Sequence, residues 1–142
     1  MSPLVIDASV VIKWFIPEVH SDAARRLLAR PHDFVAPDLL FAEAANTIWK
    51  KTQRRELTPE VARRLVADLG RIEVDTLPSR ALIEDAHALA IGTQCTVYDA
   101  LYVALAVRLN TSLVTADQRL VAALRAFPLA AAHVQFVAEF EG

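Results

Sequence analysis

Four acidic residues stand out in this sequence, because each lies at the end of an apolar run or inside one. They are Asp7, Glu43, Asp99 and Asp117. Carboxylate oxygens are hard ligands that select Mg²⁺ or Mn²⁺ over Zn²⁺. The four histidines are scattered and Cys95 is the single cysteine, so the sequence offers no softer metal site. If the fold brings the four carboxylates together, we expect them to bind one or two divalent cations.

Two of these acids follow short β-branched runs. Asp7 comes directly after Leu4-Val5-Ile6, and Asp117 comes shortly after Leu113-Val114-Thr115. In open α/β sheets, ligands bind beyond the carboxyl ends of parallel strands. If the two strands are neighbours, the two carboxylates converge at that edge. Each acid also precedes a helical pattern, so an N-cap remains the alternative role for both.

Asp99 is the most informative of the four positions, because it is the only charge between Val97 and Val107. A helix that is apolar on all sides is buried. A buried carboxylate is costly unless it is paired, hydrogen-bonded or bound to a metal. The alternative is a capping box, with Thr96 at the N-cap and Asp99 three residues later. The two roles can coexist, since a capped helix start can also direct an acid into a cleft.

Glu43 lies on a helical pattern whose nearby positions are mostly small or apolar. A solvated surface glutamate is the ordinary interpretation of such a residue. One turn away on the same face, however, lie Leu39 and Leu40 on one side and Asn46 and Thr47 on the other. A lone acid on a face that is otherwise small and apolar is less often a plain surface residue.

The elements that must position these acids alternate along the chain, with short β-branched runs between longer helical patterns. Strands are expected at residues 4–6, 34–36, 72–77, 112–115 and 133–140. Helices are expected at 21–30, from Pro37 to about 54, after Thr58, from Ser79 to 91 with Gly92 ending the helix, at 96–110 and at 117–126. Strands separated by helices predict parallel pairing and an α/β sandwich.

The totals limit the possible functions. The chain has 142 residues, which fits one domain over residues 1–142. A net charge of -2 counts against a general nucleic-acid binder, but not against a nuclease whose acids surround a cation. A single cysteine excludes an internal disulfide framework and is typical of a cytoplasmic protein. No signal peptide is recognisable and no uncharged run approaches the ~18 residues of a membrane helix, so we expect no membrane association.

Four stretches carry a family resemblance: VIDASV (5–10), PDLLFAEAAN (37–46), YDALYVALA (98–106) and LVTAD (113–117). Together they span nearly the whole chain, which resembles PIN-domain ribonucleases and, within them, the VapC-like toxins of type II toxin–antitoxin systems. The resemblance implies a PIN-like three-layer α/β/α sandwich with a central, mainly parallel sheet of about five strands. It also implies metal-binding and catalytic roles for Asp7, Glu43, Asp99 and Asp117, and supporting roles for Ser9, Asn46 and Thr115.

The function implied by the resemblance is hydrolysis of RNA by a Mg²⁺- or Mn²⁺-dependent endoribonuclease. We expect Asp7 and Asp99 to hold the principal ion, and Glu43 and Asp117 to complete the site directly or through water. The metal would lower the pKa of a water and orient it at phosphorus. By the same resemblance, the products would carry a 5′-phosphate and a 3′-hydroxyl.

The expected partners are the RNA substrate, a cognate antitoxin protein and a second copy of this chain. Lys50, Lys51, Arg54 and Arg55 cluster at one helix end and are predicted to bind RNA phosphates. The alternative is a solvated helical hairpin whose cations balance helix dipoles. The apolar run at residues 10–16 suggests, through the resemblance, a groove for an antitoxin helix; core packing is the alternative.

Two other classes remain open on the residues alone. A phosphotransfer receiver would need paired acids after the first strand and a late lysine, and a phosphatase of the haloacid dehalogenase type would need Asp-x-Asp. Here Asp7 is followed by Ala8-Ser9, and no lysine occurs after Lys51. A non-catalytic RNA-binding or antitoxin-binding module is the third class, which metal-dependent cleavage would exclude.

Overall fold

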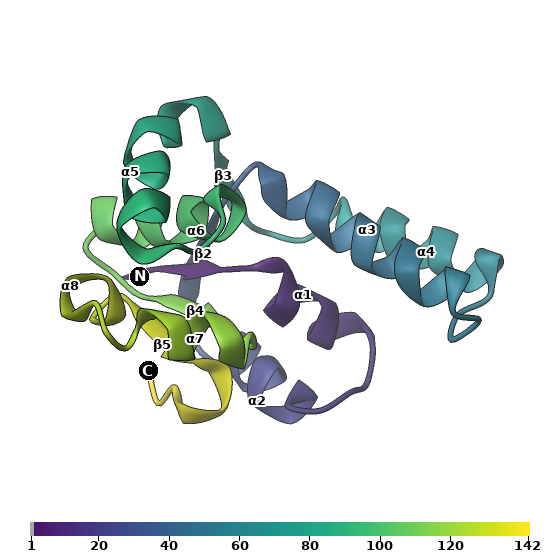
Figure 1. Cartoon of the computed structure of the whole chain (residues 1–142). Helices are drawn as coiled ribbons and strands as arrows, with labels where there is room; N and C mark the ends of the chain where they lie inside the picture. Colours follow the sequence, from purple (N-terminus) through teal and green to yellow (C-terminus); the bar gives the residue numbers. More distant parts are fainter. Residues whose placement is uncertain (1) are drawn as a thin grey trace.

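The computed structural model describes residues 2–142. Over this range it forms one sheet of five parallel strands in the order β3-β2-β1-β4-β5 (Figure 1). The strands are β1 (Ser2–Ile6), β2 (His32–Pro37), β3 (Asp75–Leu77), β4 (Leu113–Thr115) and β5 (Val134–Phe136). Helices connect successive strands, as parallel pairing requires. The predicted α/β fold with a parallel central sheet is thus confirmed.

The centre of the sheet places the carboxyl ends of β1 and β4 side by side. Ile6 of β1 is paired with Val114 of β4, and the other edge of β1 is paired with β2. The ends of β1 and β4 are buried and, except for Thr115, apolar, which is typical of a parallel strand covered on both faces. Asp7 and Asp117 therefore follow neighbouring strands, as the sequence predicted.

The helices are α1 (Ala8–Phe15), α2 (Ser21–Arg26), α3 (Leu39–Gln53), α4 (Pro59–Leu69), α5 (Ile83–Thr93), α6 (Val97–Arg108), α7 (Gln118–Leu124) and α8 (Pro128–Ala131), with short 3-10 turns at η1 (Leu27–Ala29), η2 (Ser79–Ala81) and η3 (Val137–Glu139). Figure 1 shows α3 and α4 as a long hairpin that projects away from the sheet. Helix α1 starts directly after β1 and contacts α3. This contact forms one wall of the site described below.

Helix α6 forms the centre of the core. Its residues from Ala100 to Ala106 are all buried, and the helix contacts β1 and β2. The prediction of a buried helix behind Asp99 is therefore confirmed. Among residues 2–142, no single helix is long and apolar enough to cross a membrane; α5 and α6 pass that test only as a pair, with a bend of 113° between them.

Several predicted boundaries were wrong, mainly where a turn replaces a regular element. Pro37 ends β2 and does not start a helix, because the next residue still donates its N–H to Leu77 of β3. The strand expected at 72–77 is shortened to β3, since the N–H of Ile72 closes a turn onto Leu69 at the end of α4. Ser79 begins a 3-10 turn, and α5 starts at Ile83.

The ends of the last elements also differ from the predictions. Helix α5 continues to Thr93 and ends at Gln94 in the left-handed conformation with φ of 65°, so Gly92 lies inside the helix. The strand expected at 133–140 is confined to β5, and a 3-10 turn follows it. Helix α8 was not predicted, although it starts at Pro128, a favoured residue for a first helical position.

Candidate active site

A cavity of about 410 Å³ opens at the carboxyl ends of β1 and β4. Its wall is made of Asp7, Ala8, Ser9, Ile12, Lys13, Glu18, Glu43, Asn46, Thr47, Lys50, Lys51, Arg54, Asp99, Tyr102, Ala116 and Asp117. All four predicted acids line this cavity, although they come from four separate parts of the chain. We call the part formed by these acids the acidic end. Lys13 of α1, Lys50 and Lys51 of α3, and Arg54 just after α3 line another part of the wall, together with Glu18, and we call this part the basic end.

Asp7 is the most deeply buried acid of the site, with 8% of its surface exposed. Its Oδ1 accepts hydrogen bonds from the Ser9 hydroxyl at 2.5 Å and the Val10 N–H at 3.3 Å, and its Oδ2 accepts one from the Thr115 hydroxyl at 2.5 Å. Burial raises the pKa of Asp7 to about 6; the hydrogen bonds oppose this shift and the charge of Asp99 adds to it.

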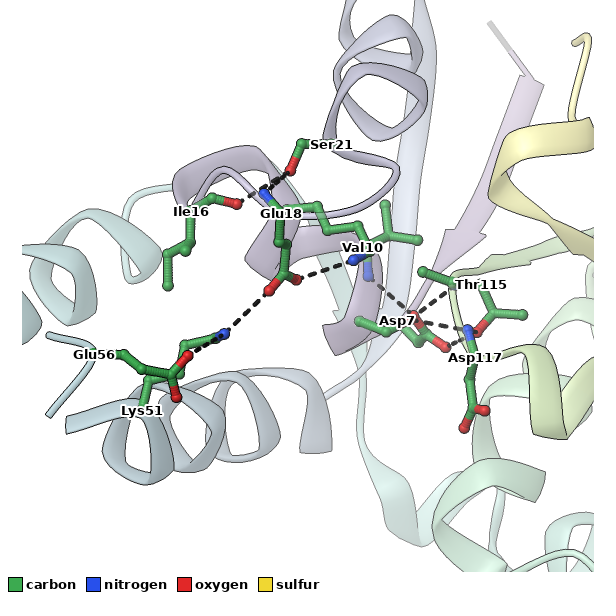
Figure 2. A network of polar contacts seen from close by, with 12 residues as sticks. Asp7, Val10, Ile16, Glu18, Ser21, Lys51, Glu56, Thr115 and Asp117 are labelled. Atoms are coloured by element: carbon green, nitrogen blue, oxygen red, sulfur yellow. Dashed lines mark hydrogen bonds and ion pairs between the residues drawn. The ribbon is translucent and has the colours of Figure 1, made fainter. Parts of the chain in front are cut away.

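The two hydroxyls are themselves fixed by the backbone that follows β4. Ser9 Oγ accepts the N–H of Ala116 at 2.9 Å, and Thr115 Oγ1 accepts the N–H of Asp117 at 3.0 Å. Figure 2 shows Asp7, Thr115 and Asp117 joined in this network. Because each hydroxyl accepts from the backbone, its proton is free to be donated to Asp7. The network joins the end of β1 to the end of β4 and fixes the Asp7 carboxylate.

The N-cap roles weighed for Asp7 and Asp117 are also present. Asp7 caps α1 through the Val10 N–H, and Asp117 Oδ1 caps α7 by accepting from the N–H groups of Arg119 at 3.0 Å and Leu120 at 3.3 Å. Both residues nevertheless line the cavity. A capping role and a place in the site are therefore compatible in this fold.

Glu43 is held by a residue that the sequence analysis did not single out. The buried Tyr102 on α6 donates its hydroxyl to Glu43 Oε1 at 2.6 Å. Burial raises the pKa of Glu43, the Tyr102 hydrogen bond opposes this shift and the charge of Asp99 adds to it. Burial and the adjacent Glu43 carboxylate also raise the pKa of Tyr102, so the phenol stays a donor. Tyr102 lies on the same face of α6 as Asp99, one turn later, which was the available sequence signal.

Asp99 lies in the first turn of α6 and is partly buried. Thr96 caps this helix by accepting the Asp99 N–H at 3.1 Å, so the capping prediction is confirmed for this bond. Burial raises the pKa of Asp99, and the negative charge of Asp117 raises it further. Asp99 also lines the cavity.

The acids share a cavity, but they do not form a tight ligand cluster. Among residues 2–142, no group of three His, Cys, Asp or Glu side chains lies close enough together to hold a metal ion. Like charges repel, and several carboxylate oxygens already accept hydrogen bonds. The four acidic side chains therefore stay apart from one another, although all of them line the same cavity.

The basic residues predicted from the sequence divide into two groups. Lys50, Lys51 and Arg54 line the cavity, as does Asn46. Arg55 is not in the cavity wall that residues 2–142 form; it follows α3 with a positive φ of 61°, which turns the chain out of the helix. The prediction of a cationic rim is consistent with the first three residues and does not extend to Arg55.

Core packing explains much of the apolar run at residues 10–16. Val10, Val11 and Ile12 are buried in the core. Trp14 packs against Phe34 with ring centroids 5.2 Å apart and donates its indole N–H to the carbonyl of Ala24 at 2.8 Å. These side chains are engaged within the chain. The one charge in the run, Lys13, lines the cavity and was missed, as was Glu18.

The fold and the sequence define a known class of protein. The family model of the PIN domain matches residues 4–125, so the chain belongs to the PIN-domain family. Within that family it belongs with the VapC ribonucleases. It is 34% identical to ribonuclease VapC3 of Pyrobaculum aerophilum over 119 residues, which cover 82% of this chain and 91% of that protein.

Two solved structures are similar in fold. The crystal structure of a protein from Pyrobaculum aerophilum matches with a TM-score of 0.69 and 21% identity, over 97% of this chain and 93% of that one. The toxin–antitoxin complex from Klebsiella pneumoniae matches with a TM-score of 0.65 and 16% identity, over 96% and 99%. At these identities the comparison shows the shared fold alone.

Proposed function

We propose that this chain is a metal-dependent endoribonuclease, the toxin of a toxin–antitoxin pair, and that it hydrolyses RNA phosphodiester bonds in the cavity at the ends of β1 and β4. One observation carries the proposal. Four acids from separate parts of the chain line one cavity whose other end carries lysines and an arginine. An acidic end suits a cation at the reacting phosphate, and a basic end suits the flanking phosphates. The family membership supports the same chemistry.

The acidic end fits Mg²⁺ or Mn²⁺ by its donor set and its electrostatics. Its acids are carboxylates, and burial raises the pKa of Asp7, Glu43 and Asp99. A nearby cation favours the ionised form of each and would reverse these shifts. Mg²⁺ usually keeps several waters and takes one or two protein carboxylates. A site whose carboxylates surround a space without contacting one another is compatible with an ion that keeps several waters.

We assign the principal ion to Asp7 and Asp99, with Glu43 and Asp117 completing the site directly or through water. When bound, such an ion supplies a water activated at neutral pH and a Lewis acid beside the phosphate. Ser9 and Thr115 fix the direction of the Asp7 carboxylate, and Tyr102 fixes that of Glu43.

RNA binding is assigned to one face of α3. Glu43, Asn46, Thr47, Lys50, Lys51 and Arg54 are spaced by three or four residues, and all of them line the cavity. Along this face the charge changes from negative near the sheet to positive near the tip of the hairpin. A single RNA strand following α3 would place one phosphate at the acids and its neighbours at the cations.

The direct test is cleavage of RNA by the purified chain with MgCl₂, MnCl₂ or EDTA. We expect cleavage that needs a divalent cation and is lost in Asp99→Asn, with melting curves showing that the variant is folded. A thermal shift provides a second readout, because a ligand at 100 times its dissociation constant adds roughly 2.7 kcal/mol of stability. Wild-type cleavage rates in folded Asp99→Asn would refute the assignment. An aspartyl-phosphate formed from a phosphodonor would instead favour the phosphotransfer class.

The expected protein partners are a cognate antitoxin and a second copy of this chain. Expression of the chain alone should slow growth, and co-expression of a small protein encoded beside it should restore growth. For pairing of two copies, an apolar pocket between α5 and α8 offers a surface, since it is bordered by Leu129, which is 89% exposed. Light scattering on the purified chain and on Leu129→Asp tests this pairing.

A further inference from the structure

The basic end of the cavity contains an ion-paired cluster that joins three elements. Lys13 comes from α1, Glu18 from the loop after α1, and Lys51 from α3. Lys13 Nζ lies 3.0 Å from Glu18 Oε1, and Lys51 Nζ lies 3.1 Å from Glu18 Oε2. Figure 2 shows Glu18 and Lys51 in this contact, with Glu56 on the outer side. All three members of the cluster line the cavity that contains the four acids.

The two lysine side chains of the cluster are more buried than those of an ordinary surface ion pair, although Glu18 itself is an exposed residue. The side chains of Lys13, Lys51 and Glu18 are 12%, 16% and 28% exposed. Fixing a long lysine side chain in one conformation costs rotamer entropy, and exposed ion pairs contribute little to the stability of the fold. Two lysines are nonetheless held in place here, both on the wall of a cavity. Stabilisation of the fold alone does not require them to face that space.

Glu18 is well suited to hold the two lysines because its own backbone is fixed. Its N–H donates to Ser21 Oγ at 2.9 Å, and that hydroxyl donates to the Ile16 carbonyl at 3.1 Å. The Ser21 N–H donates back to the Glu18 carbonyl at 3.1 Å. Partial burial works to raise the pKa of Glu18, but the bonds and charges of Lys13 and Lys51 outweigh it and lower that pKa. Glu18 is therefore ionised at neutral pH.

The cluster keeps capacity for a further anion. Each ammonium group has three N–H donors, and the contact with Glu18 uses one of them on each lysine. Lys50 and Arg54 line the same end of the cavity, so four cations face one carboxylate there. Glu56 lies 3.9 Å from Lys51 and is half exposed, which makes its pairing weak. Lysine binds phosphate as a point charge, so a phosphodiester oxygen is the fitting acceptor.

We propose that Lys13 and Lys51 form a binding site for a backbone phosphate of the RNA next to the phosphate that is cleaved, and that Glu18 is the positioning residue that holds both ammonium groups there. This proposal rests on the proposed function, because it places the strand relative to the acidic end. It differs from a general cationic rim, since it assigns a defined role to a negative residue.

The sign of the effect of Glu18→Gln tests the proposal. Removing a negative charge next to RNA should tighten binding if the cluster acts only through its net charge. If Glu18 positions the lysines, its loss should weaken binding by about fivefold, since two rotamer-rich side chains must then be ordered by the RNA itself. Glu56→Gln is the matched control. This variant also removes one negative charge near Lys51, but Glu56 is not part of the cavity wall formed by the described residues. We therefore expect RNA binding that is unchanged or slightly tighter.

Binding is measured by fluorescence anisotropy with a labelled single-stranded RNA of random sequence, in EDTA and over a series of KCl concentrations. Lys13→Met and Lys51→Met should each weaken binding by about tenfold. Each should also reduce the slope of log affinity against log salt, by at most about 0.7, because the two lysines share one phosphate and 0.7 is the value for one phosphate contact of a single strand. In the cleavage assay with MgCl₂, all three cluster variants should raise KM and leave kcat unchanged.

The binding assay needs no cleavage, so the two proposals can fail separately. If wild-type protein does not cleave RNA but the binding changes appear, the catalytic proposal fails, while binding of an RNA phosphate by Lys13 and Lys51 and the positioning role of Glu18 stand. If wild-type protein cleaves and Glu18→Gln binds as well as Glu56→Gln, the phosphate site is refuted. A lower melting temperature of Glu18→Gln with unchanged affinity and KM would also refute it, since that result describes a purely structural ion pair.

Discussion

The two ends of the cavity are built in different ways. At the acidic end, Asp7 is fixed by the half-buried Ser9 hydroxyl and the buried Thr115 hydroxyl, and Glu43 by the phenol of the buried Tyr102. At the basic end, Lys13 and Lys51 are held by charge–charge contacts across the junction of α1 and α3. Hydrogen bonds in the core fix direction, while ion pairs near solvent fix direction less tightly and respond to salt.

This difference assigns different tasks to the two ends. Chemistry at phosphorus needs groups placed within a fraction of an ångström, which suits the rigid acidic end. Holding a flexible strand needs charge at the correct distance and tolerates movement. The acidic end should therefore determine kcat, and the basic end should determine KM and the salt dependence of binding.

The largest expected effect, and the most direct way to break this division, is Asp7→Asn. A metal centre lowers the activation barrier by several kcal/mol, so loss of a principal ligand should lower kcat by about a thousandfold. Steady-state cleavage with MnCl₂ and MgCl₂ measures this, with Lys51→Met as the comparison. A fall in kcat for Lys51→Met as large as that for Asp7→Asn would show that the two ends are not separate.

The second effect is the pH dependence of stability without metal. Burial raises the pKa of the Asp7 carboxyl from its ordinary value of 3.8 to about 6 in the folded chain. The folded state thus holds the proton more strongly, and stability falls as pH rises from about 4 to about 6. This shift in pKa corresponds to a loss of about 3 kcal/mol in the free energy of unfolding.

Urea denaturation in EDTA at a series of pH values measures this effect. Asp7→Asn has no charge at this position, so it should lose that part of the pH dependence and exceed the wild type in stability at pH 7. Variants at the basic end should keep the wild-type pH profile. If Asp7→Asn showed the same pH profile as the wild type, burial of Asp7 would not be the cause of the loss of stability between pH 4 and pH 6.

The third prediction concerns Tyr102, which tests how far hydrogen bonding fixes the acidic end. Tyr102→Phe keeps the ring in the core and removes the donor to Glu43. Partners that orient a metal-binding side chain are typically worth 10-fold to 100-fold in activity, so we expect kcat to fall by about tenfold. The salt slope of RNA binding should not change. An unaltered kcat would mean that Glu43 needs no such support.

The same contrast explains what the sequence could predict. Asp7, Asp99 and Asp117 were identifiable because each is a charge beside an apolar strand or helix, and apolar patterns report burial directly. The parallel sheet followed from strands separated by helices. That β1 and β4 are neighbours could only be assumed, because pairing between residues about 108 apart leaves no local pattern.

The parts that were missed depend on contacts between distant segments. Tyr102 looks like any core aromatic until α3 brings Glu43 to its hydroxyl. Glu18 lies in a loop with no periodic pattern, and its role exists only because α1 and α3 meet. The boundary errors at Gly92 and Ser79 have a local cause, since Gln94 and the 3-10 turn replaced the expected helix end and start.

The smallest expected effect separates two adjacent arginines and defines how far the basic end extends. Arg54 lines the cavity, whereas Arg55 leaves the helix with a positive φ. Arg54→Ala should reduce the salt slope of RNA binding by about 0.7, and Arg55→Ala should leave it unchanged. Each variant removes one positive charge, and the two positions are adjacent in the chain. Each variant therefore controls for the change in net charge in the other. Equal losses in the two variants would show that RNA binding follows the overall charge of the hairpin tip, and the basic end would then be a diffuse surface with no defined path for the strand.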